Sequence, residues 1–302
     1  MLVSIAGFRL CRWPRPVKEI MSFVPVVVFA DIDEGFLATD VSNGAARTGE
    51  ILDRENIVPV LCSHMTRVEL DVWQQHLGIA HPFICESGAA VLISHGYFPF
   101  EPPHDRDLAG HHVIEFGRSY VEVVKLLHRT ARRVHVDVVG FSDMSVEQVA
   151  TAYDLSLSRA RLAKLREYDE PVRVINGRDG ARERLLRSLY AAGLASNYQG
   201  AYDHIGAAVD KGTSVKLLTA LFRRTFGPLI TIGVGSTTNS AALLRSVDVP
   251  FIVASDRAAP DLQELPRIPR LHLTPGVVPW IEAIGEIARQ TRETHDRVRT
   301  LG

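Results

Sequence analysis

The chain has 302 residues, of which 46% are hydrophobic and 23% are charged, and its formal net charge is −1. This length suits two domains, and the near-neutral balance gives neither a basic stripe for nucleic acid nor an acidic tail. No apolar run is long enough to span a bilayer, so we expect no nucleic-acid partner and no membrane partner. The cysteines Cys11, Cys62 and Cys85 show no metal-ligand spacing, which predicts reduced thiols in a cytoplasmic protein.

Residues 1–24 are predicted to form an N-terminal extension, because their apolar stretch lacks the basic start and the cleavage site of a secretory signal. The run 26–30 (VVVFA) is β-branched and aromatic, which is typical of a parallel strand buried on both faces. It stops at Asp31, and a polar, glycine-containing turn follows over residues 31–35.

Strands and helices then alternate. Thr66 and Glu69 have the spacing of a capping box at a helix N-terminus. The elements predicted up to this point are helices over 45–56 and 66–77 and strands over 58–62, 82–85 and 89–93.

The alternation pauses between residues 95 and 203, where helices dominate, and resumes afterwards. The paused segment has predicted helices near 119–133, 145–151, 156–165 and 180–193 and strands near 134–139 and 172–175. The resumed segment has helices over 213–224, 239–246 and 277–298 and strands over 229–234 and 250–254. We therefore predict an α/β fold with a parallel-sheet core over 25–94 and 204–302 and an inserted α+β domain over 95–203.

Polar residues follow the predicted core strands, where open parallel sheets bind their ligands. Asp31 and Asp33 form a pair in which one carboxylate can attack an electrophile while the other transfers a proton; the plain alternative is a solvated turn. Ser63 follows the second strand, where a hydroxyl and a backbone N–H can hold a phosphate oxygen, although an ordinary turn serine has the same pattern. Lys211 opens a helix and could neutralise a carboxylate and a bound anion, or lie on the surface.

The run 233–240 (GVGSTTNS) joins a buried strand to a helix. Its glycines and hydroxyls could cradle an anion with backbone N–H groups, or form a tight turn whose hydroxyl caps the helix.

These pieces, in this order, resemble the haloacid dehalogenase (HAD) superfamily, whose motifs are an aspartate pair after strand one, Ser or Thr after strand two, a lysine, and acidic residues after a later strand. More narrowly, residues 26 to about 280 are similar to the mannosyl-3-phosphoglycerate phosphatase family. The segments that carry this match are 63–69 (SHMTRVE), 86–89 (ESGA), 140–145 (GFSDMS), 166–171 (REYDEP) and 210–212 (DKG).

The resemblance implies a HAD-like Rossmannoid core with a C2-type cap and a phosphatase acting on a small molecule, a phosphorylated sugar or glycosyl-glycerate. Asp31 would attack phosphorus and form an aspartyl-phosphate, and Asp33 would protonate the leaving oxygen and then activate water. Ser63 and Lys211 would bind the phosphoryl group, and Mg²⁺ would bridge Asp31 and the phosphate, with Asp33 as a further candidate ligand. The polar contacts to the sugar acid would come from Arg67, Glu86, Arg166, Glu167 and Asp169. A salt-bridged surface turn is the alternative for the last three.

The chain departs from the family at the fourth motif, approximately G-x-G-D-x-x-N-D, where both acidic positions are serine: Ser236 and Ser240 flank Asn239. Mg²⁺ is commonly held by one or two carboxylates, and a neutral hydroxyl does not replace their charge. The sequence therefore predicts that Mg²⁺ binding is weakened or absent.

Two alternatives stay open beside the phosphatase. The first is a metal-independent enzyme acting on a non-phosphorylated glycoside or acid, because metal-free carbon-centred members of the superfamily also carry Ser and Asn in this loop. The second is a non-catalytic protein that keeps the pocket and binds its ligand without turnover.

Overall fold

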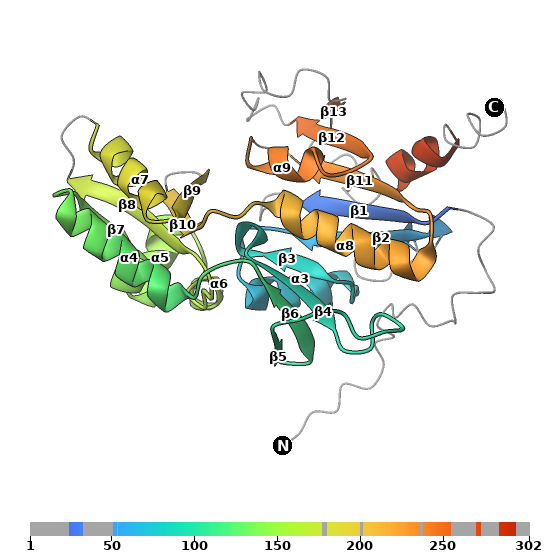
Figure 1. Ribbon diagram of the computed structural model, residues 1–302, viewed down its shortest axis with the longest axis horizontal. Coiled ribbons are helices and arrows are strands. Elements are labelled where there is room, and N and C mark those ends of the chain that lie inside the picture. The colour runs from blue at the N-terminus through green and yellow to red at the C-terminus, as the bar shows by residue number, and fades with distance from the viewer. Residues whose placement is uncertain are drawn as a thin grey trace.

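The computed structural model describes residues 24–32, 51–52, 54–176, 180–199, 202–235, 238–254, 270–272 and 284–293. The predicted extension, Cys11, Asp33, Ser236 and most of the helix predicted over 45–56 lie outside these residues. In Figure 1 two β-sheets lie beside each other, each with its own helices. None of the helices in the described ranges combines the length and apolar character that a membrane span requires.

The larger sheet has nine strands and is parallel over most of its width. In spatial order the strands are β13 (Arg270–His272), β12 (Val249–Ala254), β11 (Ile230–Gly235), β1 (Val26–Asp31), β2 (Ile57–Cys62), β3 (Phe83–Cys85), β4 (Ala90–Ser94), β6 (His111–Glu115) and β5 (Arg106–Leu108). The last three run antiparallel to their neighbours. β1 lies inside the parallel part, between β11 and β2, so its carboxyl end opens where ligands of such sheets bind.

Alternate residues of β1 face opposite sides of the sheet, and both sides are buried. Val26 and Val28 pack in a core with α3 (Arg67–Leu77) and the helical residues 284–293. Val27 and Phe29 pack in a second core with α8 (Lys211–Phe226) and α9 (Ala241–Leu244). This confirms the prediction of a strand buried on both faces, because a side chain on either face of β1 is removed from water.

The smaller sheet is antiparallel, in the order β7 (Asp137–Gly140), β8 (Glu170–Asn176), β10 (Tyr202–Ala207) and β9 (Leu194–Gln199). Helices α4 (Tyr120–Arg133) and α7 (Ala181–Ala191) share a hydrophobic core with β8 and β10. Helices α5 (Val146–Tyr153) and α6 (Leu157–Ala163) pack together around Phe141.

The predicted core strands and the capping box of α3 are confirmed: Glu69 N donates to the Thr66 hydroxyl, and the Thr66 backbone N donates to the Glu69 carboxylate. The helix predicted over 239–246 is shorter, a 3₁₀ turn over Thr238–Ser240 followed by α9. Strands β5, β6, β9, β10 and β13 were not predicted. Half-buried histidines in β6 and buried Asp203 and His204 in β10 interrupt the apolar pattern from which strands are predicted.

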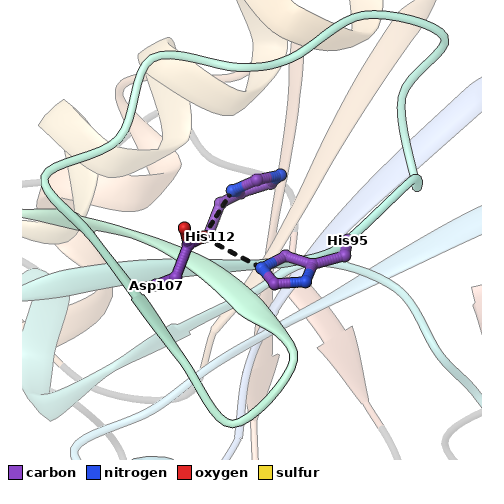
Figure 2. A group of neighbouring side chains, drawn as sticks. All are labelled: His95, Asp107 and His112. Carbon is purple, nitrogen blue, oxygen red and sulfur yellow. Dashed lines mark hydrogen bonds and ion pairs between the residues drawn. The ribbon is translucent and has the colours of Figure 1, made fainter.

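The larger sheet extends past residue 95, since β5 and β6 belong to it, and the smaller sheet extends past residue 203 to the end of β10. We therefore propose that the inserted domain begins after β6 and ends after β10. The antiparallel border β4–β6–β5 forms one edge of the larger sheet, and His95, Asp107 and His112 lie together on it (Figure 2).

Candidate active site

Asp31 is the last residue of β1, at the carboxyl edge of the parallel sheet. Lys211 Nζ donates a hydrogen bond to its Oδ1 at 2.5 Å, and Ser240 Oγ donates to its Oδ2 at 2.7 Å. The Lys211 and Asp31 side chains are only 3% and 10% exposed. Such a buried pair is stable when further hydrogen bonds satisfy the remaining lone pairs, and the Ser240 hydroxyl supplies one. Both oxygens of Asp31 are therefore held in one orientation.

Close backbone packing brings Lys211 to this edge. Asp210 caps α8 by accepting a hydrogen bond from Thr213 N at 3.0 Å, which fixes Lys211 as the first helical residue. The 3₁₀ turn over Glu86–Gly88 packs on that helix start, and Ser214 Oγ donates to Gly88 O at 2.9 Å. Gly88 has φ +103°, and a Cβ there would lie 2.8 Å from the backbone of Asp210 and Lys211. Only glycine allows this approach.

Ser240 reaches Asp31 for a similar reason. A Cβ on Gly235 would lie 2.3 Å from Ser240 Cβ, so the glycine at the end of β11 lets the following turn fold back on the strand. Asn239, in the same turn, donates from Nδ2 to the carbonyl of Tyr198 at 2.8 Å, which links the predicted fourth-motif loop to the smaller sheet. The serine at the second acidic position of that motif thus contacts the predicted nucleophile directly.

Ser63 lies beside Asp31 but uses its donors within the protein. Its hydroxyl donates to Ile32 O at 2.8 Å, and its backbone N–H donates to Ile84 O at 3.0 Å. The residue is fully buried. To bind a phosphoryl oxygen, as predicted, the hydroxyl would have to leave the carbonyl of Ile32.

Two further polar side chains at this edge are held in their neutral forms. Burial and the neighbouring Asp31 carboxylate raise the pKa of the Cys62 thiol well above its usual range. Burial, the neighbouring His204 imidazole and the cations Lys211 and Arg166 hold the pKa of His64 well below its usual range. A protonated thiol is a weak nucleophile, so among these groups Asp31 is the one equipped to attack.

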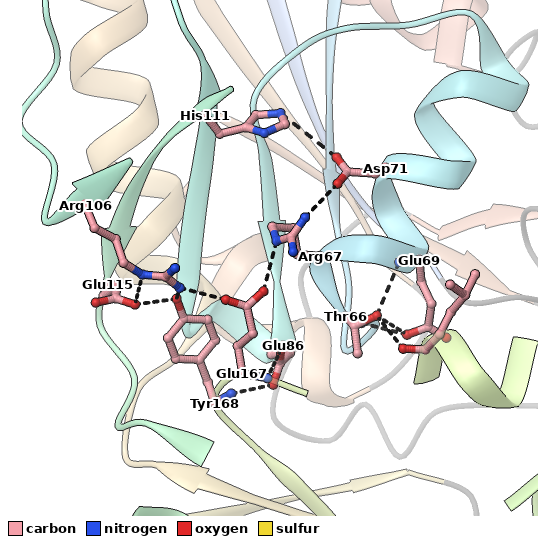
Figure 3. A network of polar contacts seen from close by, with 11 residues as sticks. Thr66, Arg67, Glu69, Asp71, Glu86, Arg106, His111, Glu115, Glu167 and Tyr168 are labelled. Atoms are coloured by element: carbon pink, nitrogen blue, oxygen red, sulfur yellow. Dashed lines mark hydrogen bonds and ion pairs between the residues drawn. The ribbon is translucent and has the colours of Figure 1, made fainter. Parts of the chain in front are cut away.

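The predicted substrate contacts form two internal networks, and Figure 3 shows the first of them together with Glu86 of the second. In the first, Glu167 accepts from Arg67 Nε at 2.9 Å and from Arg106 Nη2 at 2.7 Å. Arg67 also pairs with Asp71 at 3.1 Å. Arg67 is on α3, which packs on the larger sheet, and Arg106 is on β5, a strand of that sheet. Glu167 therefore joins both elements to the segment that leads into β8.

The second network is buried. The carboxylate of Glu86 accepts the backbone N–H groups of Glu167, Tyr168 and Asp169 at 2.8 to 2.9 Å. Arg166 forms an ion pair with Asp169 and donates from Nη2 to His64 O at 2.8 Å. Burial of Arg166 and Asp169 contradicts the alternative of a salt-bridged surface turn for these two residues, since both side chains are under 5% exposed.

Not all polar atoms of this network are satisfied. Within the described residues, Asp169 Oδ2, Arg166 Nε and His204 Nδ1 are buried and make no hydrogen bond of good geometry, although Arg166 Nε lies 3.6 Å from Glu86 Oε2. His204 Nδ1 and Asp169 Oδ2 lie 3.4 Å apart, and the His204 ring packs edge-on against His64 at 5.3 Å. Because an unsatisfied buried polar group is costly, a bound water, ion or substrate group would stabilise this arrangement.

The motif segments 140–145 and 166–171 meet at Glu170. Its Oε1 accepts from the backbone N–H and hydroxyl of Ser142 at 2.8 and 2.6 Å, and its Oε2 accepts from Tyr120 OH at 2.6 Å. A Cβ on Gly140 would lie 2.2 Å from Glu170 Oε1, so any larger residue there would displace the Glu170 carboxylate. These motifs shape the inserted segment around Arg166 and Asp169.

Sequence reasoning missed His64 and His204. His64 follows Ser63 at a strand end, which is a signal that could have singled it out. His204 had none, because β10 was not predicted and the residue reaches the site only through the pairing of β10 with β8.

The described donor set does not by itself fit Mg²⁺. Asp31 is engaged at both oxygens by Lys211 and Ser240. In the ranges that the structure describes, the cluster of three ligating side chains that could hold a metal ion lies elsewhere, at His95, Asp107 and His112. Mg²⁺ needs near-octahedral oxygen coordination, commonly with one or two carboxylates. Asp33 and Ser236 lie outside the described residues.

Curated proteins of similar sequence carry one type of name. A glucosyl-3-phosphoglycerate/mannosyl-3-phosphoglycerate phosphatase of Methanococcoides burtonii is 35% identical over 229 residues, covering 75% of this chain and 84% of that protein. A protein of the same name from Persephonella marina is 30% identical over 269 residues, covering 88% and 98%. No family model matches the chain.

Solved structures agree on the fold. A haloacid dehalogenase-like hydrolase from B. subtilis has a TM-score of 0.55 at 13% identity and covers 84% of this chain and 97% of its own. A HAD-superfamily phosphatase from Bacteroides thetaiotaomicron has a TM-score of 0.54 at 11% identity and covers 87% and 95%. At these identities the similarity concerns the fold alone.

Proposed function

Because the chain belongs to the family of glucosyl-3-phosphoglycerate/mannosyl-3-phosphoglycerate phosphatases within the HAD superfamily, we propose that it removes the phosphate from a glycosyl-3-phosphoglycerate or a related sugar phosphate. The chain is a phosphatase-like hydrolase. The observation that carries the proposal further is the contact of Asp31 with Lys211 at the carboxyl end of β1.

The proposed reaction has two displacements at phosphorus. An oxygen of Asp31 attacks phosphorus, the bond from phosphorus to the glycerate oxygen breaks, and Asp33 gives that oxygen a proton. Water, deprotonated by Asp33, then attacks the aspartyl-phosphate and releases inorganic phosphate and the free Asp31 carboxylate. The Lys211 ammonium offsets the negative charge that the carboxylate and the phosphoryl oxygens bring together.

Metal dependence is proposed to be weaker than an acidic fourth motif would give. Bound Mg²⁺ would supply further positive charge to the phosphoryl oxygens, with Asp31 as the described carboxylate able to approach it. The support for weaker binding is the Ser240 hydroxyl, which is neutral and donates to Asp31 where the family pattern has a second acidic group.

The sugar acid is proposed to lie beside the buried network that contains Arg166 and Asp169. Buried Arg166 and Asp169 and the unsatisfied Nδ1 of His204 offer a cation, an anion and a hydrogen-bonding nitrogen close to the Asp31 edge. Arg67, Glu86 and Glu167 hold the segment that carries Arg166 and Asp169. A hydroxyl-rich, anionic small molecule satisfies such a set, since each of its groups replaces a missing hydrogen bond.

The test is phosphate release from glucosyl-3-phosphoglycerate, mannosyl-3-phosphoglycerate and simple sugar phosphates, with and without Mg²⁺. We expect release from at least one glycosyl-phosphoglycerate, and a loss of about 10⁴-fold or more in Asp31→Asn. The control is Asp154→Asn, which alters an exposed carboxylate at the end of α5, where asparagine tolerates the positive φ. Absence of release across the panel, with Mg²⁺ supplied, would refute the proposal.

One observation favours a second candidate, a metal-independent enzyme acting on a non-phosphorylated glycoside or acid. Asp31 already has a cation and a hydroxyl on its oxygens, so it needs no metal to be oriented. This candidate would be selected if a non-phosphorylated substrate were turned over fully in the presence of a metal chelator, while none of the phosphorylated substrates released phosphate.

A further inference from the structure

A cluster of histidines around one carboxylate lies at the antiparallel border of the larger sheet. His95 Nε2 lies 2.9 Å and His112 Nδ1 lies 2.8 Å from the same oxygen, Asp107 Oδ1. Figure 2 shows both rings directed at this carboxylate. One potential ligand atom from each of the three residues lies within 4.8 Å of the others.

We propose that His95, Asp107 and His112 form a binding site for a divalent transition-metal ion of the Zn²⁺ type. Two imidazole nitrogens and a carboxylate oxygen are a donor set that suits Zn²⁺ and not Mg²⁺. In a tetrahedral zinc site neighbouring donors are about 3.3 Å apart, so these nitrogens have to move only about 0.5 Å away from the oxygen that they now contact. The ion would replace the protons that now join the two imidazole nitrogens to the Asp107 carboxylate.

The backbone holds the three residues in register. Asp107 and His112 are directly paired across β5 and β6, and Ile93, two residues before His95, pairs with His112 across β4 and β6. His95 N donates to Gly110 O at 2.9 Å. The hairpin between β5 and β6 turns at Ala109 and Gly110, both with positive φ, as a two-residue β-turn of this hand requires. The ligands are therefore presented by a fixed ladder.

His104 is the candidate for a fourth ligand. Its Nδ1 lies 3.0 Å from Pro102 O, a carbonyl that can only accept, so Nδ1 carries a proton and Nε2 is the nitrogen that would coordinate a metal ion. That Nε2 lies 3.7 Å from Asp107 Oδ2, and the ring centre lies 4.4 Å from that of His112. Metal-binding histidines commonly bond a carbonyl through their other nitrogen in this way, because the bond fixes the ring orientation.

This site is separate from Asp31. Ala90, at the start of β4, pairs with Cys85 near the edge where Asp31 lies, and β4 runs antiparallel to β3 toward the opposite edge. Ser94 is four residues further on, about 13 Å along the strand, and His95 follows it. The proposal is therefore independent of the proposed function. Its role would be structural, since the ion would tie three strands together where β5 is an edge strand.

The test is Zn²⁺ binding to the full chain without a polyhistidine tag, by calorimetry and by competition with a chromophoric chelator. We expect one Zn²⁺ per chain, a raised midpoint of thermal unfolding, and Co²⁺ absorption of the tetrahedral type. The double variant His95→Asn/His112→Asn should bind Zn²⁺ at least about 100-fold more weakly, and His104→Asn about 10-fold more weakly. The matched control is His128→Asn on α4, whose imidazole lies 3.5 Å from Asp143 and outside the cluster.

Two results would overturn the proposal. One is the absence of Zn²⁺ binding by the unmodified chain. The other is Zn²⁺ binding that the double variant retains and Asp31→Asn removes, which would place the ion at the candidate active site instead. If the double variant does not fold, Asp107→Asn, which keeps the shape of an exposed side chain, replaces it in the same comparison.

Discussion

At the scale of single residues, the site depends on how Asp31 is held. Its two oxygens accept from different elements: Lys211 opens α8, and Ser240 lies in the turn after β11. The ammonium of Lys211 is a compact positive charge that can stabilise the negative charge developing on a phosphoryl group. Because neither side chain of the pair is more than 10% exposed, replacing one of them should also change the free energy of unfolding.

Replacing Lys211 by methionine should destabilise the fold as well as lower turnover. It leaves the Asp31 carboxylate buried without its cation, and removal of one partner of a buried pair lowers the free energy of unfolding by about 3–5 kcal/mol. Urea unfolding measures this. The double variant Asp31→Asn/Lys211→Met should regain part of the loss, and equal stability of the single and double variants would contradict the account.

Replacing Ser240 by aspartate should create a dependence on Mg²⁺. A second carboxylate about 4 Å from Asp31 is repelled by an energy on the order of 4 kcal/mol, and a divalent cation between them removes the repulsion. We expect the variant to unfold at a lower temperature than the unmodified chain in a chelator and to be stabilised by Mg²⁺. The unmodified chain should respond less to Mg²⁺. An identical response of both proteins to Mg²⁺ would count against the role given to Ser240.

At the scale of elements, the 3₁₀ turn over Glu86–Gly88 joins three parts of the molecule. Glu86 and Ser87 have positive φ, which is uncommon for residues other than glycine and is retained here because the turn is pinned on both sides. Gly88 packs on the start of α8, and the Glu86 carboxylate binds the backbone of residues 167–169. This short turn thus sets both the position of Lys211 and the entry into β8.

The Glu86 carboxyl should make stability depend on pH. Burial raises its pKa to about 7, whereas the unfolded chain keeps the ordinary value near 4.5. Between these values the folded chain holds a proton that the unfolded chain has lost. The stabilisation is therefore complete below about pH 4.5 and is lost as pH rises to about 7, a change on the order of 3 kcal/mol.

The measurement is the free energy of unfolding of the unmodified chain and of Glu86→Gln between pH 5 and 8. The variant loses an acceptor for the backbone N–H groups and should be less stable at pH 5. The gap should narrow as pH rises, because only the unmodified chain carries the titrating carboxyl. Histidines with lowered pKa, such as His64 and His81, act in the opposite direction in both proteins and cancel in the difference. A gap that stays constant would contradict the raised pKa.

At the scale of the whole molecule, the parallel core and the edge that carries Asp31 could be predicted, because apolar strands followed by polar residues leave a clear pattern. Asp31, Lys211 and Ser240 were identified from such strand and helix ends, and the structure brings them into contact. The smaller sheet was only partly predicted. Its strand β10 buries Asp203 and His204, and a pattern of polar residues does not show that Arg182 on α7 and Ser196 on β9 satisfy Asp203.

The internal pairing of the predicted substrate contacts also could not be predicted. Arg67 and Glu167 are 100 positions apart in the chain, and only the packing of the two sheets brings them together at 2.9 Å. The cluster of His95, Asp107 and His112, at the end of β4 and on β5 and β6, could not be predicted for the same reason. Its spacing matches no local metal motif, and its geometry comes from strand register.

The central claim is that Asp31 is the nucleophile. The most direct measurement is acid quenching of the enzyme during turnover of a glycosyl-3-phosphoglycerate, followed by mass spectrometry of the peptide that contains Asp31. The account predicts a phosphoryl group on Asp31 in the unmodified chain and none in Asp31→Asn. Phosphate release without a phosphorylated Asp31, or with the phosphoryl group on another residue, would contradict it.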